Sequence, residues 1–305
     1  MKKIVFVVLV LCGWWLLATT QTAHANDSRS AQSGGAPVPY KMSLPFVVNG
    51  NIQPPMPDIR FGLNNVSEVE AATLGFSAPT NNDRYRLNEY QGSVIRLMPG
   101  SISGFRAFVG ARPGRAWIVG NEPANSNYMT PTQHAKWYHD TYYLIKSIDP
   151  TAKVAYYATT VRLREQPYML EFWTEYKRLY RSPVPTDFIA FHYYPARGTQ
   201  WSIDDMAADI SRLIAFLDAH RGAEWDGPRL YWLTEFGLRA WEVPVSENDA
   251  MAFMSASIAW LKGNPDIAMW AWWPSGRPTE WSENTSLIKD GAPTELGKLY
   301  LELAK

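Results

Sequence analysis

The chain has 305 residues, of which 46% are hydrophobic and 14% aromatic. This composition supplies one sizeable core and excludes a chain that is disordered throughout. Lysine plus arginine and aspartate plus glutamate both number 29, so the formal net charge is zero. No basic surface of the kind that nucleic acid requires is therefore indicated, and we expect no nucleic-acid partner.

Residues 1–25 have the features of a cleaved signal peptide. Lys2 and Lys3 precede an apolar run over 4–18, and the sequence AHA at 23–25 fits an A-x-A cleavage signal. An uncleaved anchor is the alternative, but the run is short for a membrane span. We therefore expect a secreted or periplasmic protein with no stable membrane span after signal cleavage.

The mature chain is expected to begin with a linker and to contain no thiol. Cys12 is the one cysteine and lies in the signal segment, so neither a disulfide nor a cysteine metal site is expected. Residues 26–57 are rich in Ser, Gly, Ala, Gln and Pro without periodicity, which is typical of a tether or a loosely packed collar. We place one folded domain over 58–305.

The region before Trp117 contains few clear elements. Residues 58–63 and 93–98 are strand-like, and residues 65–75 are helix-like. Three complete βα units cannot be counted here. We therefore predict that this side of the domain is short or distorted.

From residue 116 onward, apolar strands and amphipathic helices alternate. One helix is predicted after Thr130, which is a candidate N-cap, because Pro131 and Gln133 complete a capping signal. Further strands are predicted at 154–161, 188–195, 229–237 and 267–274, and further helices at about 166–181, 206–217, 246–263 and from 294. This alternation favours an α/β fold, a (β/α)₈ TIM barrel, with an open doubly wound sheet as the alternative.

Two glutamates follow strands of this predicted sheet. Glu122 follows the strand over 116–119, and Glu235 follows the strand over 230–233, so both lie at the face that carries the chemistry of such barrels. At about 5.5 Å the two carboxylates would repel by roughly 3 kcal/mol, or about two pKa units, at an effective dielectric near 20. One would then stay protonated, which suits glycoside cleavage. Each also has an ordinary explanation: a favourable charge at a helix N-terminus for Glu122, and half of a structural ion pair for Glu235.

Four motifs occur in the order of a known enzyme group. They are WIVGNEP (117–123), FHYYP (191–195), LYWLTEFG (230–237) and MWAWWP (269–274). Together they resemble the clan A glycoside hydrolases, which are retaining (β/α)₈ enzymes, and most strongly the bacterial secreted hydrolase-like members. The resemblance implies that Glu122 is the general acid/base, that Glu235 is the nucleophile, and that Asn121 hydrogen-bonds the sugar 2-hydroxyl.

The resemblance also implies roles for residues around the pair. His192 and Tyr194 lie two apart and so point to the same side of their strand, and Tyr194 is expected to hold the nucleophile. Trp272 resembles the family's sugar-platform tryptophan, with Trp270 on the same side below it. Arg96 resembles the arginine that keeps the nucleophile ionised. Strand and core roles are the ordinary alternative for these residues, since tryptophan is highly buried on average.

No motif indicates a metal, nucleotide or other cofactor. His134 and His139 are five apart on a helix and do not share a face as a metal pair would, so we interpret both as surface residues. The sequence thus predicts a monomeric, exported, retaining glycoside hydrolase that cleaves a β-linked carbohydrate by double displacement. The alternative is a catalytically silent barrel that binds a surface polysaccharide. The identity of the sugar is not indicated.

Overall fold

The computed structural model describes residues 47–48, 51–52, 60–76, 86–88, 92–100, 103–126, 128–162, 165–195, 201–240, 242–276 and 284–305. The chain divides into two units, Met1–Gln53 and Pro54–Lys305. The described part of the first unit is an antiparallel pair of short strands, β1 (Val47–Val48) and β2 (Asn51–Ile52). The predicted signal peptide (1–25), with Cys12, and most of the predicted linker (26–57) lie outside the described residues. The second unit contains the predicted domain.

A parallel sheet of nine strands, in the order β7-β6-β5-β4-β3-β13-β12-β10-β8, forms the centre of the second unit. The two end strands, β7 (Lys153–Ala155) and β8 (Ala158–Thr160), are consecutive in the chain; β7 pairs with β6 and β8 with β10. They share one strand position, and the sheet closes through this segment into the predicted (β/α)₈ barrel. The other strands are β3 (Phe61–Asn64), β4 (Arg86–Asn88), β5 (Val94–Leu97), β6 (Ala116–Val119), β10 (Ile189–Tyr193), β12 (Tyr231–Phe236) and β13 (Ile267–Trp272).

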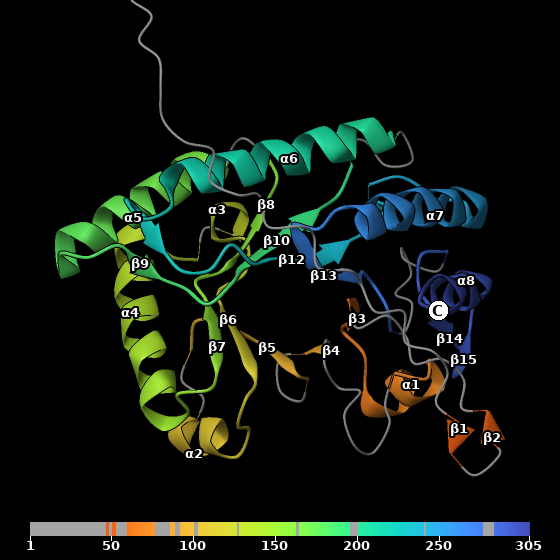
Figure 1. Cartoon of the computed structure of the whole chain (residues 1–305), viewed down its shortest axis with the longest axis horizontal. Helices are drawn as coiled ribbons and strands as arrows, with labels where there is room; N and C mark the ends of the chain where they lie inside the picture. Colours follow the sequence, from red (N-terminus) through yellow and green to blue (C-terminus); the bar gives the residue numbers. More distant parts are fainter. Residues whose placement is uncertain are drawn as a thin grey trace, which may run out of the picture. The chain divides into compact units, whose positions relative to one another are not determined.

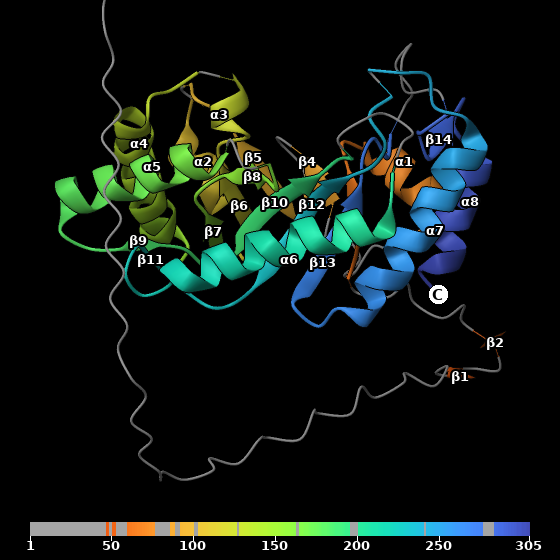
Figure 2. The same cartoon turned by 90° about the horizontal axis from the view of Figure 1, so that it is seen from above.

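Long helices flank the second half of the barrel (Figures 1 and 2). They are α4 (Pro131–Ile148), α5 (Glu165–Tyr180), α6 (Ile203–His220), α7 (Glu247–Gly263) and α8 (Glu295–Leu303). The predicted start of α4 is confirmed, because Thr130 and Gln133 form a reciprocal capping box. The predicted apolar face of α6 is buried along its length. Among the described helices, none combines the length and the apolar character needed to cross a bilayer.

The first half of the barrel is reduced, as the sequence predicts. Its helices α1 (Glu68–Thr73) and α2 (Phe105–Gly110) have six residues each. Strands β4 and β5 are joined by residues 89–93, a connection too short for a crossover helix. Neither β4 nor α2 is apparent from the sequence. Strand β4 has one apolar residue, Leu87, and no β-branched or aromatic one, and α2 follows a glycine without a side-chain cap.

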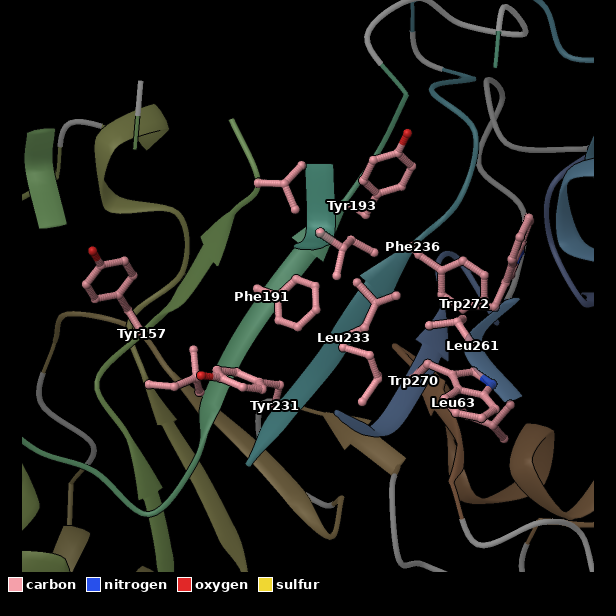
Figure 3. Close-up of a cluster of buried hydrophobic side chains, with 14 of the residues drawn as sticks. Leu63, Tyr157, Phe191, Tyr193, Tyr231, Leu233, Phe236, Leu261, Trp270 and Trp272 are labelled. Carbon is pink, nitrogen blue, oxygen red and sulfur yellow. The ribbon is translucent and has the colours of Figure 1, made fainter. Parts of the chain in front are cut away.

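Side chains of the strands alternate between two apolar layers. Along β6, Ala116 and Ile118 lie in the cluster inside the barrel, whereas Trp117 and Val119 lie in the larger cluster under the helices. Figure 3 shows the larger cluster along β10, β12 and β13. This alternation decides which side chains at the strand ends can reach the barrel opening.

Candidate active site

The turn after β6 explains the glycine and the glutamate in GNEP. Gly120 has φ +111, and a Cβ there would lie 3.0 Å from the Tyr128 hydroxyl and 3.1 Å from the His134 ring, so the position requires glycine. Glu122 has φ +43, a left-handed conformation that costs a non-glycine residue on the order of 1–3 kcal/mol and is enriched at functional sites. The Glu122 N–H donates to the Ala158 carbonyl at 2.8 Å, which ties this backbone to β8.

A bulge in β12 places Glu235. Strand β10 pairs with Leu233 and then directly with Glu235, so Thr234 is an extra residue. Leu233 and Phe236 both pack under the helices, and a regular strand would turn Glu235 to the same side as Leu233. The bulge instead lets the Glu235 carboxylate reach the opening of the barrel.

The two glutamates meet at His192. One donor or acceptor atom from each of Glu122, His192 and Glu235 lies within 4.8 Å of the other two. His192 Nδ1 is 2.7 Å from Glu122 Oε1 and 3.4 Å from Glu235 Oε2. The imidazole is 1% exposed, so its contact with the carboxylates is shielded from water.

Glu235 is held by two further side chains. Arg96 Nη1 donates to Oε1 at 2.8 Å, and the Tyr194 hydroxyl donates to Oε2 at 2.7 Å. Burial, together with the charge of Glu235, raises the pKa of Tyr194 well above its usual value, so this hydroxyl remains a donor. Arg96 Nη1 also donates to Asn121 Oδ1 at 3.1 Å. The structure therefore places six of the candidate residues close together: Glu122, Glu235, Asn121, His192, Tyr194 and Arg96.

The role of general acid that the resemblance implies requires a protonated Glu122, but in this structure Glu122 is ionised at neutral pH. Burial alone would raise its pKa, but the hydrogen bond and charge of His192, the Asn125 amide and the charge of Arg162 lower it to about 2. Burial alone would lower the pKa of His192, but the charges of Glu235 and Glu122 and the bond to Glu122 raise it. At neutral pH the proton therefore lies on the His192 side of the Glu122–His192 pair.

The predicted positions of Trp270 and Trp272 at the site are also wrong. Both side chains are fully buried in the layer under the helices (Figure 3). Trp272 donates its ring N–H to the Thr285 carbonyl at 2.7 Å, and Trp270 packs edge-to-face on Phe61. The next residue, Trp273, is half-buried and lies edge-to-face with Tyr194, with 6.0 Å between ring centroids.

His134 is not the surface residue that the sequence suggests. It is fully buried, and burial lowers its pKa to about 4. Its Nε2 lies 3.1 Å from the Val119 carbonyl, which only accepts, so Nε2 carries the proton and supports the end of β6. His139 is half-buried and stacks on Tyr180.

Two residues that sequence reasoning missed support the Glu122 turn. Asn125 Nδ2 donates to Glu122 Oε2 at 2.7 Å from the short helix α3 (Pro123–Ser126). The Tyr128 hydroxyl accepts the Asn121 N–H at 2.8 Å. In the sequence, the i, i+3 spacing of Glu122 and Asn125 is the pattern that could have indicated this contact.

A cavity of about 290 Å³ lies beside this arrangement and is lined in part by Glu122, His192 and Tyr194. Glu122, His192 and Glu235 are also the set of described residues that could hold a metal ion. A proton on His192 Nδ1 and the positive charge of Arg96 beside Glu235 both compete with a cation there. The arrangement is better suited to moving a proton and holding an ionised carboxylate.

Residues 106–300, more than half of the chain and including both glutamates, match the family described as glycosyl hydrolase catalytic core. The chain belongs to this glycosyl hydrolase family. The match confirms the predicted kinship with glycoside hydrolases, and no curated protein matches this glycosyl hydrolase in sequence.

Solved structures similar to this glycosyl hydrolase include three GH128 enzymes. A subgroup II endo-β-1,3-glucanase from Pseudomonas viridiflava has a TM-score of 0.59 at 18% identity, over 80% of this chain and 97% of that chain. A subgroup III curdlan-specific exo-β-1,3-glucanase from Blastomyces gilchristii, in complex with glucose, has a TM-score of 0.56 at 19% identity, over 79% of this chain and 97% of that chain. A subgroup I endo-β-1,3-glucanase from Amycolatopsis mediterranei, in complex with laminaritriose, has a TM-score of 0.53 at 18% identity, over 80% of this chain and 99% of that chain. At these identities the likeness supports the fold alone.

Proposed function

We propose that this protein is a retaining glycoside hydrolase in which Glu235 is the nucleophile and Glu122 the general acid/base. The observation that carries the proposal is the asymmetric pair of carboxylates at the barrel opening, with oxygens within 4.8 Å of each other. Carboxyl groups about 5–5.5 Å apart are typical of retaining enzymes, whereas inverting enzymes leave about 6.5–9.5 Å for a water molecule. The short gap supports retention.

In the first step, a Glu235 oxygen attacks the anomeric carbon while the glycosidic C–O bond breaks. The leaving oxygen takes a proton from Glu122, and Glu122 receives that proton from His192 Nδ1, which lies 2.7 Å from Oε1. In the second step, water attacks the anomeric carbon, its proton returns to the pair, and the bond to Glu235 breaks. Each step thus forms one bond to the anomeric carbon and breaks one, and the Glu122–His192 pair gives a proton in the first step and regains one in the second.

The neighbouring residues fit supporting roles in this reaction. Arg96 and Tyr194 stabilise the ionised Glu235 before attack and when it leaves. Arg96 also occupies Asn121 Oδ1, so the Asn121 NH₂ group is the proposed donor to the sugar 2-hydroxyl. Trp273, rather than Trp272, is the proposed sugar-facing tryptophan.

The proposed substrate is a β-linked glucan, and β-1,3-linked glucose is the first choice because the similar structures are β-1,3-glucanases. Those enzymes include both endo- and exo-acting ones, so either mode is compatible with the fold. Export through a cleaved signal peptide remains the proposed localisation, and the proposed active form is a monomer.

Reducing-end release from laminarin, curdlan, mannan and xylan tests the proposal, with Glu235→Ala as the control. We expect hydrolysis of a β-glucan that disappears in the variant. Binding of a glucan without hydrolysis by wild type would instead favour a silent scaffold. Hydrolysis that persists in Glu235→Ala would refute the assigned nucleophile.

A further inference from the structure

Two arginines line the cavity beside Glu122, and the reaction described above uses neither. Arg162 follows β8, and Arg239 follows β12, so both lie at the same strand ends as the two glutamates. Their side chains are partly buried. Asn125 and Thr160 add neutral polar groups to the same cavity.

The two arginines differ in their partners. Arg239 forms an ion pair with Glu242, so its charge is offset on one side. Among the described residues, the Arg162 guanidinium has no ion pair and no side-chain hydrogen bond. Its positive charge nevertheless acts on the site, because it contributes to lowering the pKa of Glu122.

The cavity carries more positive charge than the binding of a neutral sugar requires. Glu122 already shares its charge with His192 at 2.7 Å and with the Asn125 amide. Arg162 therefore adds a positive charge that the described lining does not balance. A partly buried guanidinium that has no charged partner among the described residues is well placed to pair with a bound anion.

We propose that the sugar bound beside Glu122 carries a carboxylate, as a hexuronic acid does, and that Arg162 binds this carboxylate. This inference rests on the proposed glycoside hydrolase activity, and it replaces the neutral β-glucan by a carboxylated one as the preferred substrate of the same site. A planar guanidinium pairs with a carboxylate through two parallel N–H···O bonds. The cavity of about 290 Å³ is at the lower end of small-ligand sites and suits one sugar unit.

The neutral composition of the chain agrees with such local recognition. With 29 cationic and 29 acidic residues, the protein has no overall field that would attract a long polyanion. Selectivity for a charged sugar must then come from a few groups within the site. Arg162 supplies the charge, and Arg239 forms a second cationic part of the same lining.

Binding to an inactive protein tests the inference apart from catalysis. Glu235→Gln, which is inactive but keeps an oxygen acceptor for Arg96, would be titrated calorimetrically with laminari-oligosaccharides and with the same oligosaccharides oxidised to carboxylates at C6. We expect the oxidised ligands to bind about tenfold or more tightly, as charge-assisted hydrogen bonds contribute. The preference should shrink as salt is raised.

Replacing Arg162 in the same background identifies the group responsible. In Glu235→Gln/Arg162→Gln, the ratio of the two affinities should fall to near one, and Arg162→Lys should restore part of it because lysine keeps the charge but not the paired bonds. The matched control is Arg212→Gln on the exposed face of α6, which should leave the ratio unchanged. Sulfated laminari-oligosaccharides form a separate arm, and they should bind less tightly than the carboxylated ones.

Each result decides for or against the inference. Equal affinity for both ligands, no binding of either, a preference for sulfate, or a carboxylate preference that survives Arg162→Gln would overturn it. Hydrolysis by the wild-type protein separates the two claims. Cleavage of laminarin with no preference for the carboxylated form would leave the proposed function standing while the substrate assignment falls.

Discussion

The ends of β6 and β12 each present one glutamate, but the two regions treat the carboxylate differently. At β6 the backbone of Glu122 is left-handed, and its partners are a buried histidine and an amide. At β12 a bulge presents Glu235 to an arginine and a tyrosine hydroxyl, with His192 farther away at 3.4 Å. In the proposed reaction the first region supplies a proton, whereas the second holds a negative charge. Neighbouring side chains thus give two residues of the same type different surroundings.

Removing the Glu235 carboxylate should have the largest effect on activity. Glu235→Ala should lower kcat by about 10⁴-fold or more, as the loss of a nucleophile does in other enzymes. Added azide or formate should restore part of the activity and give a product of inverted configuration, because the small anion attacks from the position of the missing carboxylate, opposite the leaving group, in a single displacement.

The control for this variant is Glu295→Ala, at the exposed start of α8, which should behave as wild type. Circular dichroism should show that both variants are folded. Activity of Glu235→Ala near that of wild type would remove Glu235 from the reaction.

Glu122→Gln separates proton donation from binding. Hydrolysis of natural glycosides, whose leaving group needs a proton, should fall by about 10²–10⁴-fold. Aryl glycosides with acidic leaving groups should lose far less in the first step. The measurement is kcat/KM for a series of aryl glycosides plotted against leaving-group pKa, and an unchanged slope in the variant would argue against the role.

The donors to Glu235 should have smaller effects. Tyr194→Phe removes a 2.7 Å hydrogen bond to a charged group, which corresponds to a loss of about 10–100-fold in kcat. Tyr143→Phe, a half-exposed position on α4, is the matched control. A Tyr194→Phe variant that is indistinguishable from this control would show that Tyr194 does not act on the nucleophile.

The smallest expected effect is a shift of the alkaline limb in the pH profile of kcat/KM. Since the pKa of His192 is raised, the pair should keep its proton to above about pH 6.5, and kcat/KM should fall at higher pH. In His192→Gln only Glu122 can hold that proton, so the alkaline limb should move to lower pH by about one unit or more. A limb that stays in place in the variant would exclude His192 as the proton store.

The sequence was sufficient for the regular parts of the fold. The capping box at Thr130 and the apolar face of α6 are local patterns, and both appear as predicted. The segment at 154–161 was predicted as one strand, yet it forms β7 and β8. Tertiary pairing decides this split, because its two halves bond to different neighbours and no local pattern records that choice.

At the site, strand alternation was a useful but incomplete guide. It correctly placed His192 and Tyr194 on one face, and it also placed Trp270 and Trp272 together, but it could not say which face is inside. The bulge at Thr234 and the proton on His192 depend on contacts between distant strands. Such contacts are not visible in the spacing of residues along one strand.

The most direct measurement of the central claim is the trapping of a covalent sugar on the protein. The wild-type chain would be incubated with a 2-fluoro derivative of its best aryl glycoside substrate, which slows breakdown of the intermediate, and digested for mass spectrometry. We expect a mass increase of one glycosyl group on the peptide that contains Glu235, and no such increase in Glu235→Ala. An adduct on another residue, or inactivation without any adduct, would contradict the assignment of Glu235 as the nucleophile of a retaining glycoside hydrolase.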